Sequence, residues 1–181
     1  MKKILLFMLP IMALSLASCE KNKEEEEWID DSPIIQFNDL YFLQAALEGS
    51  LGEYGNQIEV DKNRDRQISE KEASVVGGLS VGFADILNMD EIKYFTALTF
   101  LECVENKLTS LDLSNNTALT DLHCSDNKLT SLDLSNNTAL TRLECNDNPL
   151  TKIILPKNHN VHEDCIQSIL NEYGDIIEYK E

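Results

Sequence analysis

The chain has little positive charge and lacks the usual signatures of an enzyme. Among its 181 residues, 15 are lysine or arginine and 32 are aspartate or glutamate, which gives a formal net charge of -17. A field of this sign repels phosphate, so we expect neither nucleic acid nor an anionic membrane surface as a partner. No glycine-rich phosphate loop occurs, and the three histidines stand near no serine or cysteine nucleophile motif. These absences argue against an enzyme.

The five cysteines lack the spacing of a disulfide framework or a zinc site. Cys103, Cys124 and Cys145 recur at a constant interval, and no Cys-x-x-Cys pair is present. A structural zinc site takes closely spaced pairs of ligands, which this pattern does not supply. We therefore expect the three recurring thiols to act as small buried apolar groups.

The beginning of the chain has the order of a signal peptide. Two lysines precede the apolar run 4–14, and small residues come just before Cys19. This run is shorter than the about 20 apolar residues of a membrane-spanning helix. Residues 16–19 resemble the lipobox of bacterial lipoproteins, in which the cysteine becomes the first mature residue and carries acyl chains. The resemblance implies a signal peptide over residues 1–18 and membrane attachment through a lipid on Cys19 only; an ordinary secretory signal is the alternative.

A polar acidic stretch follows Cys19. Residues 20–27 carry five glutamates and two lysines, a composition that does not fold alone. We predict a tether over residues 19–36. Residues 23–25, Lys-Glu-Glu, are similar to the surface-export signal of lipoproteins in Bacteroides-type bacteria. This similarity implies an outer-membrane lipoprotein exposed on the cell surface, and a solvated acidic spacer is compatible with it.

A repeat of 21 residues dominates the second half of the chain. Residues 107–120 recur unchanged as residues 128–141, and a third copy begins at Leu140 and decays after Leu155. Apolar residues and asparagines recur in a fixed lattice: Leu98, Leu101, Cys103, Asn106, Leu108, Leu111, Leu113, Asn116, then Leu119, Leu122, Cys124, Asn127, Leu129, Leu132, Leu134, Asn137, then Leu140, Leu143, Cys145, Asn148, Leu150, Ile153, Leu155, Asn158. Leu79, Val81, Ile86, Met89 and Ile92 predict an irregular coil before the first copy.

The lattice resembles the leucine-rich repeat, with cysteine in one leucine position. The wording Leu-Thr-Ser-Leu-Asp-Leu-Ser-Asn-Asn-Thr-Ala-Leu-Thr is similar to internalin-like repeats of bacterial cell-surface proteins. This resemblance implies an α/β fold in which a short solenoid occupies residues 79–160. One coil cannot bury its apolar residues alone, so neighbouring coils must stack, and the asparagines are expected to satisfy backbone groups where the chain turns.

Side chains that alternate with the buried lattice face outward. Because alternate residues of a strand point to opposite sides, inward Leu101 and Cys103 require outward neighbours. We predict that a partner, either a protein or a glycan, binds the ribbon of Phe100, Glu102, Val104, Asp121, His123, Ser125, Arg142, Glu144 and Asn146. Each unit also splits into two halves with the same motif, so the opposite ribbon is an alternative, and a solenoid that is only a spacer is another.

The end of the chain has the pattern of an amphipathic helix over residues 162–174, followed by a short strand over residues 176–179. Open edges of stacked strands invite aggregation. We therefore predict that residues 161–181 cap the solenoid.

A loop in front of the repeats fits the pattern of an EF-hand. Residues 61–72 place oxygen-bearing side chains at positions one, three, five and nine and a glutamate at position twelve. The resemblance implies that one calcium ion is bound by Asp61, Asn63, Asp65, Gln67, Ser69 and Glu72. Position six is Arg66, where the family uses glycine. We expect a small helical module over residues 37–78, with helices near residues 39–48 and 69–76; a solvated acidic turn without metal is the alternative.

Together these patterns predict a cell-surface leucine-rich-repeat lipoprotein that acts as a binding module and is stabilised by calcium. A structural or assembly subunit of an outer-membrane complex is the alternative, because a repeat architecture names no ligand.

Overall fold

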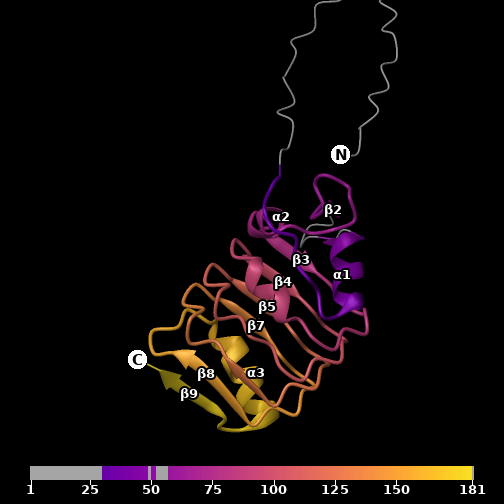
Figure 1. Cartoon of the computed structure of the whole chain (residues 1–181). Coiled ribbons are helices and arrows are strands. Elements are labelled where there is room, and N and C mark those ends of the chain that lie inside the picture. Colours follow the sequence, from indigo (N-terminus) through magenta and orange to yellow (C-terminus); the bar gives the residue numbers. More distant parts are fainter. Residues whose placement is uncertain (1–29, 49, 52–56, 181) are drawn as a thin grey trace, which may run out of the picture.

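The computed structural model describes residues 30–48, 50–51 and 57–180, and its main feature is a stack of coils (Figure 1). Strands β3 (Gly78–Ser80), β4 (Phe100–Glu102), β5 (Asp121–His123) and β7 (Arg142–Glu144) form one parallel sheet in that order. Strands β6 (Ser131–Asp133), β8 (Lys152–Pro156) and β9 (Ile177–Lys180) form a second parallel sheet. From β5 to β8 the chain alternates between the two sheets, as coils of a repeat require.

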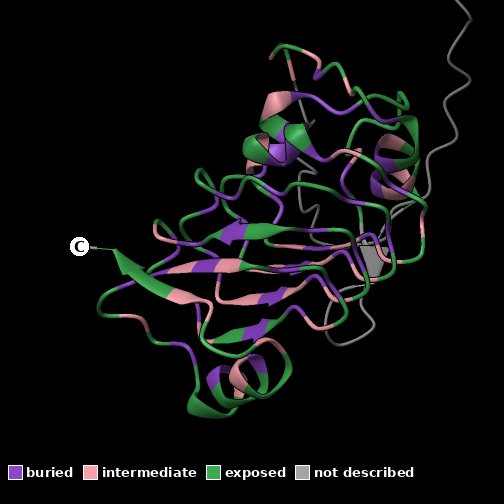
Figure 2. Cartoon of the chain, turned by 90° about the horizontal axis from the view of Figure 1, so that it is seen from below, coloured by how far each residue is buried: buried purple, intermediate pink, exposed green. Residues whose placement is uncertain are grey.

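The repeat lattice forms the core. Every lattice position is buried except Asn158, and the residues of the predicted irregular first coil are buried as well. Leu101, Leu122 and Leu143 stand in register on β4, β5 and β7, so each fills the space between its neighbours. Burial of one leucine contributes about 1.5–3 kcal/mol, which a single coil cannot gain without the next. Figure 2 shows the resulting alternation of buried and exposed residues along the strands.

Asparagine side chains stabilise the turns that follow β4, β5 and β7. Before each turn asparagine stands an acidic residue in the left-handed region, with φ of 48° at Glu105 and 55° at both Asp126 and Asp147. The Nδ2 of Asn106 donates to the carbonyl oxygens of Val81 and Cys103, one in the preceding coil and one in its own. These bonds confirm that the amides satisfy backbone groups of adjacent coils.

The N-terminal elements pack on the first coil. Helix α1 (Leu40–Leu47) follows the cap residue Asp39, β1 (Ser50–Leu51) pairs antiparallel with β2 (Gln57–Ile58), and α2 (Glu70–Ser74) follows the cap residue Ser69. Phe42 of α1 is fully buried, with its ring centroid 6.1 Å from that of Phe95 behind the 3-10 helix η1 (Asp90–Tyr94). This aromatic contact joins α1 to the repeats.

The tether predicted over residues 19–36 is too long at its C-terminal end. Ile35 is buried and its N–H donates to the carbonyl oxygen of Ile68, while the Glu70 N–H donates to the carbonyl oxygen of Pro33. Hydrogen bonds from Ser69 and Ser32 lower the pKa of Asp30 to about 2. Residues 30–36 therefore belong to the folded module. Burial of the Ile35 side chain stabilises the folded state, whereas a solvated spacer would leave this side chain in water.

Helix α3 (Glu163–Tyr173) lies against the last coil. Ile166 and Ile169 are buried, and the Tyr173 hydroxyl donates to the carbonyl oxygen of Cys145 at 2.9 Å. The Tyr173 hydroxyl oxygen in turn accepts the Asn148 N–H at 3.1 Å. Strand β9 then pairs with β8, so both the helix and the strand expected after residue 161 are present.

Candidate functional site

The exposed face of the four-stranded sheet carries two registered rows of side chains. Phe100, Asp121 and Arg142 lie in one row, and Glu102, His123 and Glu144 lie in the next. Buried leucines separate the two rows on each strand. None of the nine ribbon residues is buried, and Val104, Ser125 and Asn146 follow directly after the strands.

Contacts between neighbouring strands order this ribbon. The rings of Phe100 and His123 form a T-shaped pair with a centroid distance of 5.5 Å. Arg142 Nη1 lies 3.6 Å from Asp121 Oδ1, and His123 Nε2 lies 3.9 Å from Glu144 Oε1. Each contact joins residues from different coils, so the side chains form one continuous polar and aromatic surface. Such a preformed surface loses little side-chain entropy when a partner binds.

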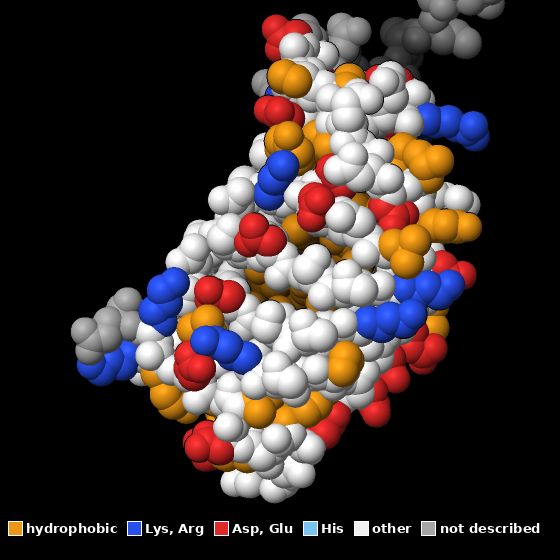
Figure 3. Space-filling model, turned by 60° about the horizontal axis from the view of Figure 1, so that its bottom comes forward, with side chains coloured by type: hydrophobic (Ala, Val, Ile, Leu, Met, Phe, Trp, Pro, Cys, Tyr) orange, Lys and Arg blue, Asp and Glu red, His pale blue; other side chains and the backbone are white. Residues whose placement is uncertain are grey.

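A pocket of about 470 Å³ extends the ribbon toward α3. Its described lining includes the ribbon residues Ser125, Glu144 and Asn146, and the further residues Asp126, Leu143, Asp147, Asp164, Cys165 and Ser168. No lysine or arginine occurs in this lining. In the view of Figure 3, acidic side chains lie along the whole length of the molecule.

The third coil is more acidic at this end because one lysine is missing. Lys107 and Lys128 follow the turn asparagines of the first two coils, but Pro149 follows Asn148. Lys107 pairs with Asp85 at 2.7 Å. Without a lysine at position 149, the third coil offers no equivalent cation to the acidic turn of the preceding coil, which contains Asp126.

The recurring thiols are not candidate nucleophiles or metal ligands. Burial, with a smaller contribution from Glu102, raises the pKa of Cys103 to about 12. Burial likewise raises the pKa of Cys145 to about 12 and that of Cys124 well above its ordinary value. A thiolate is the reactive and metal-binding form, so these three groups are chemically inert at neutral pH.

The loop over residues 61–72 is folded around its own acidic side chains. The Asp61 carboxylate accepts the N–H groups of Asp65 at 3.2 Å and Arg66 at 2.9 Å. Asn63 Oδ1 accepts the Asp65 N–H, and Asp65 Oδ1 accepts the Gln67 N–H. Arg66 has a φ of 65°, so the position where the EF-hand family uses glycine does adopt the left-handed conformation.

Glu72 is occupied by hydrogen bonds inside this loop. Its Oε1 accepts the N–H groups of Lys62 and Asn63, and its Oε2 accepts the N–H of Ser69. The side chain is fully buried, and these three bonds engage both of its oxygens. In the part of the chain that the structure describes, no three His, Cys, Asp or Glu side chains are grouped to hold a metal ion. The donor types suit calcium, and Glu72 would have to exchange these hydrogen bonds for the ion.

Solved structures of leucine-rich-repeat proteins are similar to this chain. An internalin, InlF of Listeria monocytogenes, is 23% identical with a TM-score of 0.54, over 79% of this chain and 42% of that one. The functional domain of InlJ from Listeria monocytogenes, which includes a cysteine ladder, is 31% identical with a TM-score of 0.48, over 64% of this chain and 26% of that one. This chain has the leucine-rich-repeat fold of the internalins.

The leucine-rich-repeat chain spans less than half the length of either Listeria protein. A leucine-rich-repeat protein of Leptospira interrogans is also similar, at 17% identity and a TM-score of 0.39, over 61% of this chain and 38% of that one. No protein-family model matches the chain, and no curated protein matches it in sequence.

The predicted membrane anchor lies outside the described residues. This applies to the signal peptide over residues 1–18, to Cys19 and to the tether as far as residue 29. Among the described helices, none has both the length and the apolar character that a membrane crossing requires.

Sequence reasoning did not find the residues that extend the ribbon or the residue that joins the module to the repeats. Asp126, Asp147 and Asp164 line the pocket beside α3. The replacement of lysine by Pro149 was the available sequence signal for this acidic end. Asp39 is buried and accepts the N–H groups of Leu87 and Asn88 in the first coil, and no local pattern indicates that contact.

Proposed function

We propose that this leucine-rich-repeat chain is the binding module of a cell-surface lipoprotein, and that the ribbon on β4, β5 and β7 binds a protein. The observation that carries the proposal is the contrast within each strand. The buried positions repeat from coil to coil, whereas no two coils present the same three ribbon residues. A surface that only spaced two domains apart would need no such set of ordered, distinct side chains.

The four-stranded sheet is a better candidate than the opposite one. Residues 107–120 and 128–141 are identical, so Ser110 and Asp112 recur as Ser131 and Asp133 on the second face. The edge of that sheet is also paired with β9. The opposite ribbon therefore offers less distinct chemistry to a partner.

Charge favours a partner with a basic surface. The ribbon and its pocket carry Glu102, Asp121, Glu144, Asp126, Asp147 and Asp164 against Arg142 and His123. Complementary charge speeds association and selects among partners more than it strengthens the complex. A standard interface uses about 20–30 residues a side, so this small ribbon predicts weak binding unless the pocket and α3 contribute. A glycan is the second class of partner to test.

Paired variants test the ribbon assignment. Phe100→Ala with Arg142→Ala removes one aromatic and one cation from the ribbon, while Lys152→Ala on β8 removes a cation from the opposite sheet. Each protein is immobilised and exposed to purified surface proteins and to an array of surface glycans. Loss of one defined ligand in the ribbon variant alone supports the proposal. Equal capture by both variants would rule the ribbon out.

We also propose that Cys19 carries the lipid that holds the module at the outer membrane. The support is the lipobox-like sequence and the acidic segment behind it. Two or more acyl chains hold a protein on a membrane far longer than one. The test is mass spectrometry of the mature N-terminus, with release of a Cys19→Ser variant from the membrane fraction as the functional readout.

Calcium binding at residues 61–72 is a separate proposal. The sequence spacing and the left-handed Arg66 favour it, but Glu72 would have to exchange its hydrogen bonds for the ion. Calorimetric titration tests it, with Asp65→Asn as the variant, because Asp65 is exposed and its loss perturbs the fold little. Saturable heat that Asp65→Asn removes would support binding, and absence of heat would leave an acidic turn.

The competing function is a structural subunit whose repeats pack against another envelope protein. Crosslinking in intact cells separates the two, because a stable envelope partner that tolerates the ribbon variant favours the structural subunit.

A further inference from the structure

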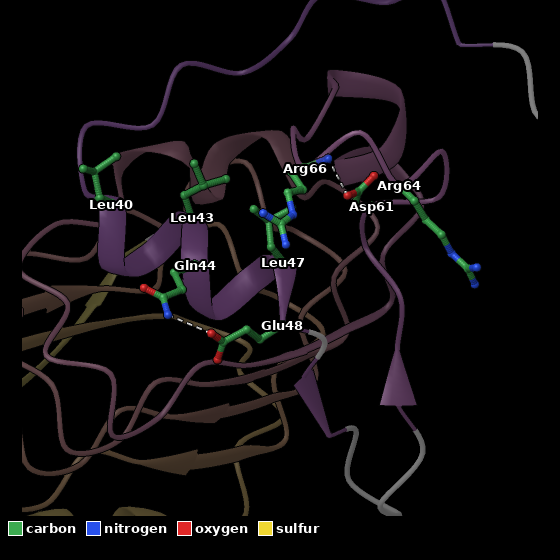
Figure 4. A pocket seen from close by; sticks show the side chains of 8 residues that line it. All are labelled: Leu40, Leu43, Gln44, Leu47, Glu48, Asp61, Arg64 and Arg66. Atoms are coloured by element: carbon green, nitrogen blue, oxygen red, sulfur yellow. Dashed lines mark hydrogen bonds between the residues drawn. The ribbon is translucent and has the colours of Figure 1, made fainter.

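A cleft of about 540 Å³ separates α1 from the loop that follows β2 (Figure 4). On the α1 side the lining consists of Leu40, Leu43 and Leu47 together with Gln44 and Glu48, which are hydrogen-bonded to each other. The opposite wall consists of Asp61, Arg64 and Arg66. Leu40 is 73% exposed, and Leu43 and Leu47 are half-buried on the same helix. The cleft therefore combines partly exposed leucines with a charged wall.

The two arginines of this cleft differ in their contacts. Arg64 points away from α1 in Figure 4, and its Nε lies 2.9 Å from Glu59 Oε1. Arg66 points toward the leucine wall, and no described side chain forms a hydrogen bond or an ion pair with its guanidinium. A guanidinium beside an apolar wall suits a ligand that presents a carboxylate next to an apolar or aromatic group.

We infer that residues 24–29 of this same chain occupy the cleft, with Trp28 against the leucines and the preceding glutamates facing Arg66. Residues 24–27 are four consecutive glutamates, and Trp28 and Ile29 follow them. The segment thus supplies an apolar group for the leucines and carboxylates for Arg66. It also relieves the exposure of Leu40, because a tryptophan buries about 150–250 Å² of surface.

The segment starts at the right place and is long enough. Its last residue, Ile29, is joined to Asp30, and the Asp30 carboxylate accepts a hydrogen bond from the Ser69 hydroxyl. Ser69 is three residues after Arg66, so their Cα atoms are at most about 11 Å apart. Six residues span up to about 20 Å when extended. Residues 24–29 can therefore reach along the cleft without moving Asp30.

Docking of this segment would shorten the tether. Only residues 20–23 would then separate the folded module from Cys19, so a lipid on Cys19 would hold the module close to the membrane. This inference concerns a different surface from the ribbon and does not depend on ribbon binding.

Fluorescence tests the inference directly because Trp28 is the only tryptophan of the chain. The full chain is purified in detergent with a chelator present, and the emission maximum and acrylamide quenching of Trp28 are measured. Arg66→Ser is expected to shift the emission to longer wavelength and to increase quenching. Leu40→Ser should do the same, since Leu40 is exposed and its loss leaves the core intact.

Arg64→Ser is the matched control. Arg64 and Arg66 both have positive φ, 61° and 65°, so serine relieves or adds the same backbone strain at either position. Emission that responds to Arg66→Ser and Leu40→Ser but not to Arg64→Ser supports docking. Emission typical of a solvated tryptophan in the unmodified chain overturns it. A blue-shifted emission that Arg66→Ser does not change would place Trp28 in detergent, and this result would overturn docking as well.

A second set of variants checks the charge pairing. Replacement of the four glutamates at 24–27 by glutamine should produce the same shift, and adding Arg66→Ser to it should produce little more. Full additivity of the two changes would contradict a direct contact.

Discussion

The side-chain Nδ2 of Asn127 donates to the carbonyl oxygen of Cys103 in the preceding coil at 2.9 Å, while its Oδ1 accepts the N–H of Leu108 at 3.1 Å. The same amide also donates to the carbonyl oxygen of Cys124 in its own coil. One side chain thus joins two coils beyond the ends of β4 and β5.

Asn127→Ala should destabilise the protein strongly. It removes all of these bonds and leaves the buried Leu108 N–H without a partner, at about 1–3 kcal/mol, whereas the carbonyl oxygens of Cys103 and Cys124 keep the amides of Asn106 and Asn148. We expect a loss of about 3 kcal/mol in the free energy of unfolding, measured by urea denaturation. Asn136→Ala in the same coil is the control, since Asn136 is exposed and makes only a 3.4 Å bond. An equal loss in both variants would contradict the role of the buried amide.

Asp39 should be the main electrostatic link between α1 and the repeats. Its carboxylate accepts the N–H groups of Tyr41 and Phe42 in α1 and of Leu87 and Asn88 in the first coil. Asp39→Asn replaces one acceptor oxygen by an NH₂ group that meets N–H donors. We expect a loss of about 3 kcal/mol in unfolding free energy. Asp175→Asn, at an exposed position, should change the unfolding free energy by less than about 0.5 kcal/mol.

The pH dependence of this effect has a defined sign. Burial acts to raise the pKa of Asp39, but the backbone hydrogen bonds outweigh it and the pKa lies below the ordinary 3.8. A lowered pKa contributes stability above 3.8 that is lost as the pH falls below it. The stability difference between the unmodified chain and Asp39→Asn should therefore shrink below about pH 3.8. If this difference in unfolding free energy does not change with pH, the charge of Asp39 is not the source of the stabilisation.

The buried thiols predict a loss of stability in alkali. The pKa of Cys124 is raised by burial far above the ordinary 9.0, so above pH 9 the unfolded chain releases a proton that the folded chain keeps. The unfolding free energy then falls by about 1.4 kcal/mol per pH unit for each such thiol. Cys124→Ala should make the decline between about pH 9 and 11 shallower by one proton. An unchanged slope in urea denaturation would argue against a buried neutral thiol.

The repeat core could be predicted from the sequence because its signal is periodic. Each inward residue of the lattice has a copy 21 residues away, so Leu101, Leu122 and Leu143 define one another's positions. Contacts that occur once carry no such signal. The partners of Asp39 lie 48 and 49 residues along the chain, and Ile35 belongs to a pair of isoleucines after Pro33 that no repeat copies. The acidic pocket beside α3 depends on one lysine-to-proline change together with the tertiary position of the helix.

Glu72 shows why a motif can leave its chemistry open. Positions nine and twelve of the EF-hand-like pattern are Ser69 and Glu72, which also form the Ser-x-x-Glu capping box at the start of α2. Both roles need a carboxylate at the same residue, so spacing alone does not separate them. The structure has the capping box, with the Ser69 hydroxyl accepting the Glu72 N–H and the Glu72 side chain accepting the Ser69 N–H.

A chelator separates the two roles by experiment. If the capping box and the bonds to Lys62 and Asn63 hold the loop, Glu72→Gln should lower the unfolding free energy by about 2–4 kcal/mol in EDTA, where no calcium is present. Asp65→Asn should have little effect under the same conditions, because its side chain is exposed. Addition of calcium should then stabilise the unmodified chain more than Asp65→Asn if the loop binds the ion. If Glu72→Gln is as stable as the unmodified chain in EDTA, the Glu72 carboxylate does not stabilise the metal-free fold. The capping role proposed for it would then be wrong.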